Sequence, residues 1–371
     1  MSQPATSLAA DGAAIKAGKA PVGQHARTHG ARIAGIVSCL PPRVLDNAYF
    51  EEQFGSGVAE VTKMTGVLTR HRADDNVTTS DLCEAAAERL LDALGWDRMS
   101  VDGLIFISQS PDYRLPATAC SMHGRMGLRV GALAFDVNLG CSGYPYGLWL
   151  AMMALQTGAA KRILLAVGDT SGRTIDHSDR ATAMLFGDAG TVTAIEATGE
   201  ANSTEKIDEA FFVLGSDGAG AGNLIVPNGA FRTHEATGKY EGRDLDKLYM
   251  DGGEIFTFTL KSVPPLINET LEVAGIAKED YDAFLLHQAN TFMINHIAKK
   301  AKLPKEKVPI NMDRYGNTSS ATIPLLLTTD LAEQVMAGPT RVGMFGFGVG
   351  YSWASASLEL GPLKIAETIT L

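Results

Sequence analysis

Along this chain, short apolar runs alternate with stretches whose apolar residues recur at helical spacing. Apolar strands are predicted at 31–41, 101–110, 132–138 and 161–169. A helix is predicted over 81–96, with Asp81 as its N-cap and Glu84 three residues later. A second helix, 142–158, follows the strand 132–138 with hardly a loop between them. Strands and helices in this order predict an α/β protein whose sheet is buried on both faces.

The second half of the chain repeats the order of the first. Residues 281–290, 308–327 and 340–348 resemble 101–110, 134–151 and 161–169, so 308–327 is predicted to contain a strand, a turn and a helix. Three landmark pairs have similar separations: Asp102 to Asp282 is 180, Cys141 to Asn317 is 176, and Arg162 to Arg341 is 179. This recurrence predicts an internal duplication, with one half at 31–200 and the other at 201–371. Residues 1–30 have no apolar core segment, so they are predicted to be a flexible extension and not a signal peptide.

Composition narrows the classes of function. The chain has 371 residues and a formal charge of −10, which disfavours general nucleic-acid binding. No apolar run is long enough to span a membrane. The four cysteines form no CxxC pair and no cluster with zinc spacing, so no metal site is predicted. Reduced thiols and a cytoplasmic location are expected.

Cys141 is the first candidate for chemistry. It stands between Gly140 and Gly143, at the turn from a strand into a helix. Most cysteines in such proteins are simply small buried apolar residues. A helix N-terminus, however, favours the thiolate, which is the nucleophilic form of cysteine. The position therefore predicts a nucleophile that attacks an electrophilic carbon.

Two polar residues in the second half are candidate partners. His287, in "LLHQAN", follows a core strand directly, which is a common place for a site in an α/β sheet. Asn317, in "RYGNTSS", occupies the position equivalent to Cys141 in the repeat, although an Asn after Gly is also a common helix cap. The glycines of "FGFGVGYSW" (345–353) expose backbone N–H groups that could stabilise an oxyanion.

Together these motifs resemble the β-ketoacyl-acyl-carrier-protein synthase III family of thiolase-like condensing enzymes. "KMTGVLTRHR" (63–72), "LPATAC" (115–120) and "TIDHSDRATAMLFGDAG" (174–190) are similar to further signatures of that family, and the match runs from about Ala31 to Leu360. The resemblance implies a duplicated, five-layered α/β/α/β/α thiolase-like fold. It also implies an acyltransferase that performs a decarboxylative Claisen condensation in fatty-acid biosynthesis.

The resemblance implies roles for individual residues. Cys141 would take an acyl group from an acyl thioester. His287 and Asn317 would hold a malonyl thioester and stabilise the enolate left when carbon dioxide departs. The backbone N–H groups of Cys141 and Val349 would form the oxyanion hole.

It also implies how substrates and partners are bound. Asn290 would contact a pantetheine arm, and Arg173 would lie near the adenine of coenzyme A. Leu115 would cap the acyl tunnel of a partner subunit in a homodimer. Lys299 and Lys300 would help to dock an acyl carrier protein. Coenzyme A or carrier phosphopantetheine thioesters would be substrates, and no cofactor would be bound permanently.

The sequence departs from the family pattern at three positions. No aromatic residue stands where the family usually has a Trp before "TG", and Met64 replaces the usual Arg. Phe292 replaces a basic residue two positions after the Asn of "HQAN". These departures leave three other functions open: an acyltransferase of specialised metabolism, a type III polyketide synthase, and a catalytically silent partner subunit.

Overall fold

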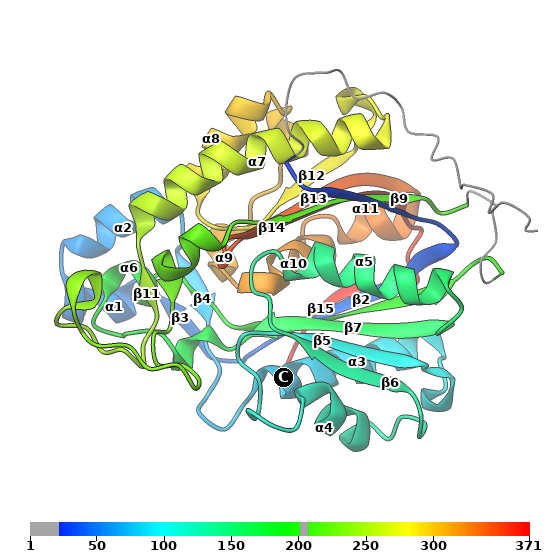
Figure 1. Ribbon diagram of the computed structural model, residues 1–371, viewed down its shortest axis with the longest axis horizontal. Helices are drawn as coiled ribbons and strands as arrows, with labels where there is room; N and C mark the ends of the chain where they lie inside the picture. The colour runs from blue at the N-terminus through cyan, green and yellow to red at the C-terminus, as the bar shows by residue number, and fades with distance from the viewer. Residues whose placement is uncertain (1–21, 201–206) are drawn as a thin grey trace, which may run out of the picture.

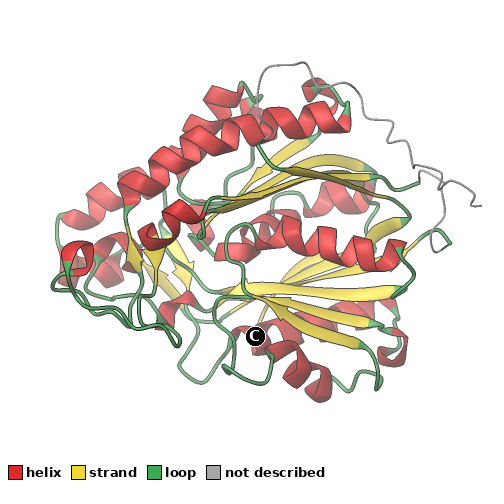
Figure 2. Cartoon of the chain, in the orientation of Figure 1, coloured by secondary structure: helices red, strands yellow, loops and turns green. Residues whose placement is uncertain are grey.

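Two mixed β-sheets lie one above the other, with helices above, between and below them (Figure 1 and Figure 2). The computed structural model of the protein describes residues 22–200 and 207–371. The five layers are the predicted α/β/α/β/α arrangement, and the thiolase-like fold is confirmed. In the described part of the chain, no helix has the length and apolar character needed to cross a membrane.

The lower sheet in Figure 1 has six strands, in the order β15-β2-β8-β7-β5-β6. Their bounds are β2 (Ala31–Leu40), β5 (Gly103–Ile107), β6 (Leu133–Val137), β7 (Arg162–Asp169), β8 (Ala189–Ala197) and β15 (Ala366–Thr370). The strands predicted at 31–41, 101–110, 132–138 and 161–169 are therefore confirmed. Strand β6 is at the edge of this sheet.

The upper sheet has five strands, in the order β1-β9-β14-β13-β12. Their bounds are β1 (Gln24–Thr28), β9 (Ala210–Ser216), β12 (Ala283–Leu286), β13 (Thr340–Gly348) and β14 (Ser352–Leu360). Two small antiparallel strand pairs lie outside the main sheets: β3 (Val44–Asp46) with β4 (Thr69–His71), and β10 (Leu224–Ile225) with β11 (Tyr249–Met250).

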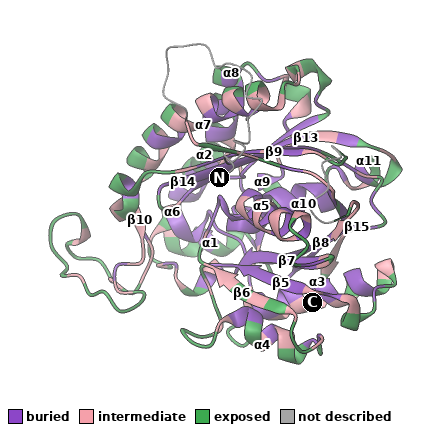
Figure 3. Ribbon diagram, turned by 45° about the vertical axis from the view of Figure 1, so that its right-hand side comes forward, coloured by how far each residue is buried: buried purple, intermediate pink, exposed green. Residues whose placement is uncertain are grey.

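The helices fall into layers by the sheet they cover. The middle layer contains α5 (Gly143–Gln156) and α10 (Thr322–Thr328). One outer layer contains α3 (Thr79–Leu94) and α4 (Thr118–Arg125). The other outer layer contains α7 (Gly252–Ala274) and α8 (Thr291–Ala301). The remaining helices are short: α1 (Ala48–Phe54), α2 (Gly57–Thr65), α6 (Arg180–Ala183), α9 (Met312–Tyr315) and α11 (Ala332–Ala337). Figure 3 shows that the strands are mostly buried, while the outer helices expose one face.

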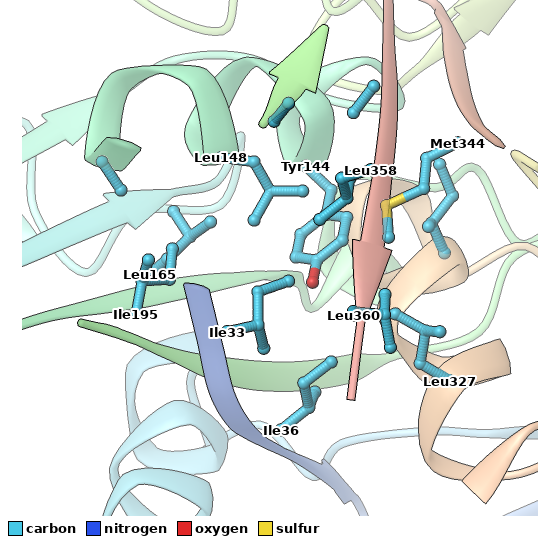
Figure 4. Packing of buried hydrophobic residues seen from close by; sticks show 14 of the residues in the cluster. Ile33, Ile36, Tyr144, Leu148, Leu165, Ile195, Leu327, Met344, Leu358 and Leu360 are labelled. Carbon is cyan, nitrogen blue, oxygen red and sulfur yellow. The ribbon is translucent and has the colours of Figure 1, made fainter. Parts of the chain in front are cut away.

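The largest core cluster fills the space between the two sheets (Figure 4). Tyr144 and Leu148 of α5 and Leu327 of α10 pack there against apolar side chains from both sheets. These three side chains are fully buried. Helix α5, which follows Cys141, is thus apolar on most of its surface because it has a sheet on each side.

The predicted duplication is visible in matching hydrogen bonds. Asp102 precedes β5, donates its N–H to Arg162 O (2.8 Å) and accepts the Arg162 N–H at Oδ2 (3.2 Å). Asp282 precedes β12 and makes the same pair of bonds with Arg341, at 2.9 and 2.8 Å. Two landmarks chosen from the sequence therefore occupy equivalent places in the two sheets.

The predicted division into halves is wrong at both ends of the chain. Strand β1 pairs with β9 of the C-terminal half, so residues 24–28 are part of the fold and not of a flexible extension. Strand β15 pairs with β2 of the N-terminal half. Residues 1–21 of the predicted extension and the start of the predicted second half, 201–206, lie outside the described residues. Each half therefore receives one strand from the far end of the chain.

Two local predictions are also wrong. Thr78, not Asp81, is the N-cap of α3, and Asp81 is its partner in a capping box. The strand predicted near 308–311 does not form, and β12 is left at the edge of the upper sheet. Pro309 has no N–H for a strand ladder, and the Asn311 N–H is bonded to the Gln288 side chain instead (3.1 Å).

Candidate active site

Cys141 lies just before the first turn of α5, where the sequence predicts it. Ser142 is the N-cap residue, and Cys141 is only 8% exposed. Strand β13 passes directly against it. A Cβ on Gly348 would lie 2.8 Å from Cys141 Cβ and 3.0 Å from Sγ, closer than ordinary contacts allow. The glycines of "FGFGVG" therefore let this strand approach the cysteine.

We expect Gly348→Ala to impair the reactivity of Cys141 because the new methyl group would displace either the thiol or the strand. The alkylation rate of Cys141 with iodoacetamide should change several-fold, and the melting temperature should fall. Gly338→Ala is the matched control, since a Cβ at that glycine meets nothing within 4 Å. Unchanged alkylation and stability in Gly348→Ala would contradict this close packing.

The Cys141 thiol is buried, and burial disfavours the thiolate form that a helix start would favour. Burial raises the pKa of the Cys141 thiol to about 12, and the charge of Asp169 adds to this effect. The Ser319 hydroxyl and the backbone N–H groups of Cys141 and Val349 oppose the rise. Desolvation therefore opposes the stabilisation of the thiolate that the helix start predicts.

Asp169, at the end of β7, is a buried carboxylate beside this thiol. Its Oδ1 accepts hydrogen bonds from Ser108 Oγ (2.9 Å), Ser110 Oγ (3.1 Å) and the Gln109 N–H (2.7 Å). Its Oδ2 has no hydrogen-bond partner among the described residues. Burial is the main cause that raises the pKa of Asp169. In the sequence, the one signal for Asp169 is that it is a polar residue at the end of a core strand.

His287 follows β12 and is almost completely buried. Its backbone N–H donates to Phe345 O (2.8 Å), which continues the ladder between β12 and β13. Its Nδ1 lies 2.8 Å from Thr322 Oγ1, and its ring meets Phe347 edge to face at a centroid distance of 5.5 Å. Burial lowers the pKa of His287 to about 3, and the Ser319 backbone opposes this only in part. The imidazole is therefore neutral at physiological pH.

Asn317 is held by the segment that precedes β8. Its N–H donates to Leu185 O (2.9 Å), and its carbonyl accepts the Gly187 N–H (3.0 Å). Gly316, with φ at +65°, makes this approach possible, since a Cβ there would lie 2.6 Å from Leu185 O. The "MLFGDAG" signature is therefore the support on which Asn317 rests.

The amide of Asn317 is oriented by a single contact. Its Oδ1 accepts the Ser319 N–H (2.9 Å), so the oxygen is engaged by the protein and Nδ2 is the end left for a ligand. Asn317 is 5% exposed. In this orientation the side chain can donate a hydrogen bond to an oxygen on a substrate.

Cys141 and His287 both lie against β13, and Ser319 links them to Asn317. Cys141 packs on Gly346 and Gly348, and His287 bonds to Phe345 of the same strand. Ser319 bonds to Asn317 and also influences the pKa of both other residues. The arrangement combines a thiol, two backbone N–H groups near it, and two neutral side chains with nitrogen atoms. It can take up an acyl group and can stabilise negative charge on a second carbonyl oxygen.

The predicted binding residues lie farther out, and two of them have structural contacts. Asn290 is the N-cap of α8, and its Oδ1 accepts the Met293 N–H (2.7 Å), which leaves only its Nδ2 for a ligand. Arg173 donates to the carbonyls of Asp75 and Val77, both at 2.6 Å. Arg173 also lines a cavity of about 610 Å³.

The remaining three predicted residues are on the surface. Leu115 is 79% exposed. Lys299 and Lys300 are in the last turn of α8, and Lys300 Nζ donates to Leu260 O (2.7 Å). Phe292, which replaces a basic residue of the family, is half exposed, and its ring contacts the tilted ring of His296 at a centroid distance of 4.1 Å.

Comparison with known proteins agrees with this geometry. Residues 135–218 match the family described as "3-Oxoacyl-[acyl-carrier-protein (ACP)] synthase III", and residues 271–360 match its C-terminal counterpart. A beta-ketoacyl-[acyl-carrier-protein] synthase III of Alkalilimnicola ehrlichii is 34% identical over 334 residues, which is 89% of this chain and 99% of that protein.

Solved structures give the same result. The 3-oxoacyl-(acyl-carrier protein) synthase of Burkholderia xenovorans LB400 is 54% identical, with a TM-score of 0.91, and the match covers 94% of this chain and 99% of that one. The 3-oxoacyl-(acyl carrier protein) synthase III of Pseudomonas aeruginosa PAO1 is 32% identical, with a TM-score of 0.79, and the match covers 91% and 99%.

Proposed function

Because the chain belongs to the 3-oxoacyl-acyl-carrier-protein synthase III family of condensing acyltransferases, we propose that Cys141 carries the acyl group and that His287 and Asn317 act on the extender. The enzyme joins an acyl thioester to a malonyl thioester by decarboxylative Claisen condensation. The observation that supports the assignment of residues is that Cys141 and His287 both lie against β13 and that Ser319 interacts with both of them and with Asn317.

In the first half-reaction, Cys141 Sγ attacks the carbonyl carbon of an acyl thioester. The backbone N–H groups of Cys141 and Val349 donate to the carbonyl oxygen as it becomes negative. Their effect on the pKa of the Cys141 thiol supports this role, because both lower that pKa by stabilising negative charge on the sulfur. The C–S bond of the incoming thioester then breaks, the proton given up by Cys141 leaves on the departing thiol, and the acyl group remains on the sulfur of Cys141.

In the second half-reaction, His287 and Asn317 hold the thioester oxygen of the malonyl extender. Carbon dioxide leaves, and the electron pair of the broken C–C bond becomes an enolate whose oxygen needs hydrogen-bond donors. Asn317 has its Nδ2 free for this, since Oδ1 is engaged by Ser319. The enolate carbon then attacks the acyl-cysteine, which forms the new C–C bond and releases the Cys141 thiolate.

The substrates would be presented on phosphopantetheine, either of coenzyme A or of an acyl carrier protein, and no resident cofactor is required. We assign Asn290 and Arg173 to the entry path, with Asn290 offering Nδ2 and Arg173 lining the cavity of about 610 Å³. Lys299 and Lys300 would attract an acidic carrier. The four cysteines are all unpaired, which suits the reducing cytoplasm that we propose as the location.

A homodimer is also part of the proposal. Strand β6 is at the edge of its sheet, and its Leu133 and Phe135 are 41% and 39% exposed. An exposed apolar edge strand is unusual unless another strand covers it. Pairing of two β6 strands about a twofold axis would extend both sheets and would bring Leu115 of each subunit near the other.

We expect the Leu133→Lys/Phe135→Lys double variant to be monomeric, because two lysines on each subunit would meet across the axis. Light scattering should give twice 39.3 kDa for the wild type and 39.3 kDa for the variant. Met336→Lys, on α11, adds a charge at a similarly exposed apolar position and should remain dimeric. A monomeric wild type, or a dimeric double variant, would contradict this interface.

The direct test of the proposed function is intact-mass analysis after mixing the enzyme with acyl-coenzyme A and acyl-carrier thioesters of increasing chain length. We expect one acyl group per chain, located on the peptide that carries Cys141. Addition of malonyl thioester should then remove the adduct and yield a 3-oxoacyl thioester. A catalytically silent subunit would form no adduct. An acyltransferase of another type would lose its acyl group only to a different acceptor, such as an amine or a hydroxyl.

A further inference from the structure

One short turn contacts both residues that act on the extender. The 3₁₀ turn Ser319–Ala321 lies between Asn317 and helix α10, and it packs against the end of β7. Ser319 has φ at +54°, a left-handed conformation that is uncommon for residues other than glycine. Because of this conformation, its N–H can reach back to Asn317 Oδ1 (2.9 Å). The turn thereby orients one of the two catalytic side chains.

The residue after the turn, Thr322, contacts the other catalytic side chain. Its Oγ1 lies 2.8 Å from His287 Nδ1 and 3.0 Å from Ser319 O, and the side chain is 2% exposed. The backbone of Ser319 also interacts with the imidazole, but Thr322 Oγ1 is the group in hydrogen-bond geometry with Nδ1 among the described residues. The hydroxyl of Thr322 is therefore the group that holds the imidazole of His287 in place.

We propose that Thr322 is a positioning residue that fixes His287 in one ring orientation and one tautomer, with Nδ1 as acceptor and the proton on Nε2. This inference rests on the proposed function, in which His287 donates to the oxygen of the extender. A neutral imidazole has a single N–H, so it can donate to a substrate through Nε2 only if Nδ1 carries no proton. The Thr322 hydroxyl must then donate to Nδ1.

The Ser319 carbonyl competes for the same hydroxyl proton. It is 3.0 Å from Thr322 Oγ1, compared with 2.8 Å for Nδ1. The carbonyl already accepts the backbone N–H of Thr322, as the cap of the turn. For the buried Nδ1, the hydroxyl of Thr322 is the donor in hydrogen-bond geometry among the described residues. Donation to Nδ1 therefore satisfies both acceptors, whereas donation to the carbonyl would need the proton of His287 to be on Nδ1.

The test uses three variants of α10. Thr322→Val has nearly the same shape without the hydroxyl, and Thr322→Ser restores the hydroxyl. Thr328→Val is the matched control, because Thr328 is also a buried threonine of α10 but bonds to Ser38 Oγ (2.7 Å) and to no residue of the site. Melting temperatures identify any variant that fails to fold.

The primary readout is the tautomer of His287, from ¹⁵N chemical shifts of the histidine-labelled enzyme. We expect a single Nε2–H tautomer in the wild type, in Thr322→Ser and in Thr328→Val, and a mixture in Thr322→Val. Decarboxylation of malonyl thioester should fall about tenfold in Thr322→Val, as expected from the loss of one hydrogen bond. Acylation of Cys141 should be unchanged, since Thr322 serves only the extender step.

Other outcomes would overturn the inference. A wild-type enzyme with the proton on Nδ1 would refute the assigned tautomer. Equal decarboxylation in Thr322→Val and Thr328→Val would reduce Thr322 to a packing residue. Failure of the proposed function is seen separately, because it would appear as a wild-type enzyme that does not decarboxylate malonyl thioester, whatever the tautomer of His287.

Discussion

Cys141→Ala is expected to abolish the acyl-enzyme completely while leaving the protein folded. The side chain is small and buried between α5 and β13, so its truncation removes one sulfur atom and adds no strain. No other cysteine is placed to replace it. Cys39 and Cys83 are buried in a different core cluster, and burial raises the pKa of each thiol. Intact mass after incubation with an acyl thioester should show no adduct in Cys141→Ala.

Cys120→Ala is the control, since Cys120 is the one exposed cysteine. It should acylate like the wild type. An adduct on a peptide that carries Cys120, or an adduct that survives in Cys141→Ala, would contradict the assignment of the nucleophile.

The same thiol allows a check of its electrostatics. Because burial raises the pKa of Cys141 to about 12, the thiol is protonated throughout the physiological range. Only the thiolate reacts with iodoacetamide, so alkylation of the empty enzyme should rise about tenfold per pH unit above pH 7. A rate that is already constant from pH 7 would mean that the helix terminus overcomes desolvation.

The second large effect is expected from His287→Ala and Asn317→Ala. Each variant should still form the acyl-enzyme, with at most a small decrease in the rate of acylation. Each should decarboxylate malonyl thioester about 10²- to 10³-fold more slowly than the wild type. Loss of one donor to a developing oxyanion typically has this magnitude. Release of carbon dioxide from labelled malonyl thioester measures the second step without the first.

His296→Ala provides the matched control, because His296 is an exposed histidine of α8 whose Nδ1 contacts only the Phe292 carbonyl (2.9 Å). It should decarboxylate at the wild-type rate. If both His287→Ala and Asn317→Ala also keep that rate, then the two residues do not stabilise an enolate. His287 would in that case be a candidate base for an incoming hydroxyl or amine.

The sequence predicts the fold well where a pattern is local and repeated. The equivalent positions of Asp102 and Asp282 in the two halves indicate the duplication. The structure agrees, because the two residues make equivalent hydrogen bonds to Arg162 and Arg341. Strand β1 is missed because its five residues, "QHART", have no apolar pattern and are held in place by pairing with β9. The expected strand near 308–311 is overridden by a contact, from Asn311 to Gln288, that no local pattern predicts.

In the candidate site, Cys141, His287 and Asn317 can be predicted from sequence motifs and their spacing. The residues that hold these three side chains in place cannot. Ser319 and Thr322 are in the "GNTSSAT" segment, yet their importance depends on which atoms of Asn317 and His287 they meet. The protonation of Cys141 is likewise a property of packing. A helix start can be predicted from sequence, whereas the desolvation that opposes its effect depends on how closely β13 approaches.

One single-turnover measurement tests the central claim most directly. The enzyme is acylated on Cys141, freed of excess acyl thioester, and mixed with malonyl thioester labelled in its free carboxylate. We predict that loss of the acyl adduct, release of labelled carbon dioxide and appearance of a 3-oxoacyl thioester occur together, with one equivalent of each per acylated chain. An acyl adduct that persists, or one that is lost without formation of the 3-oxoacyl thioester, would contradict a condensing mechanism at this site.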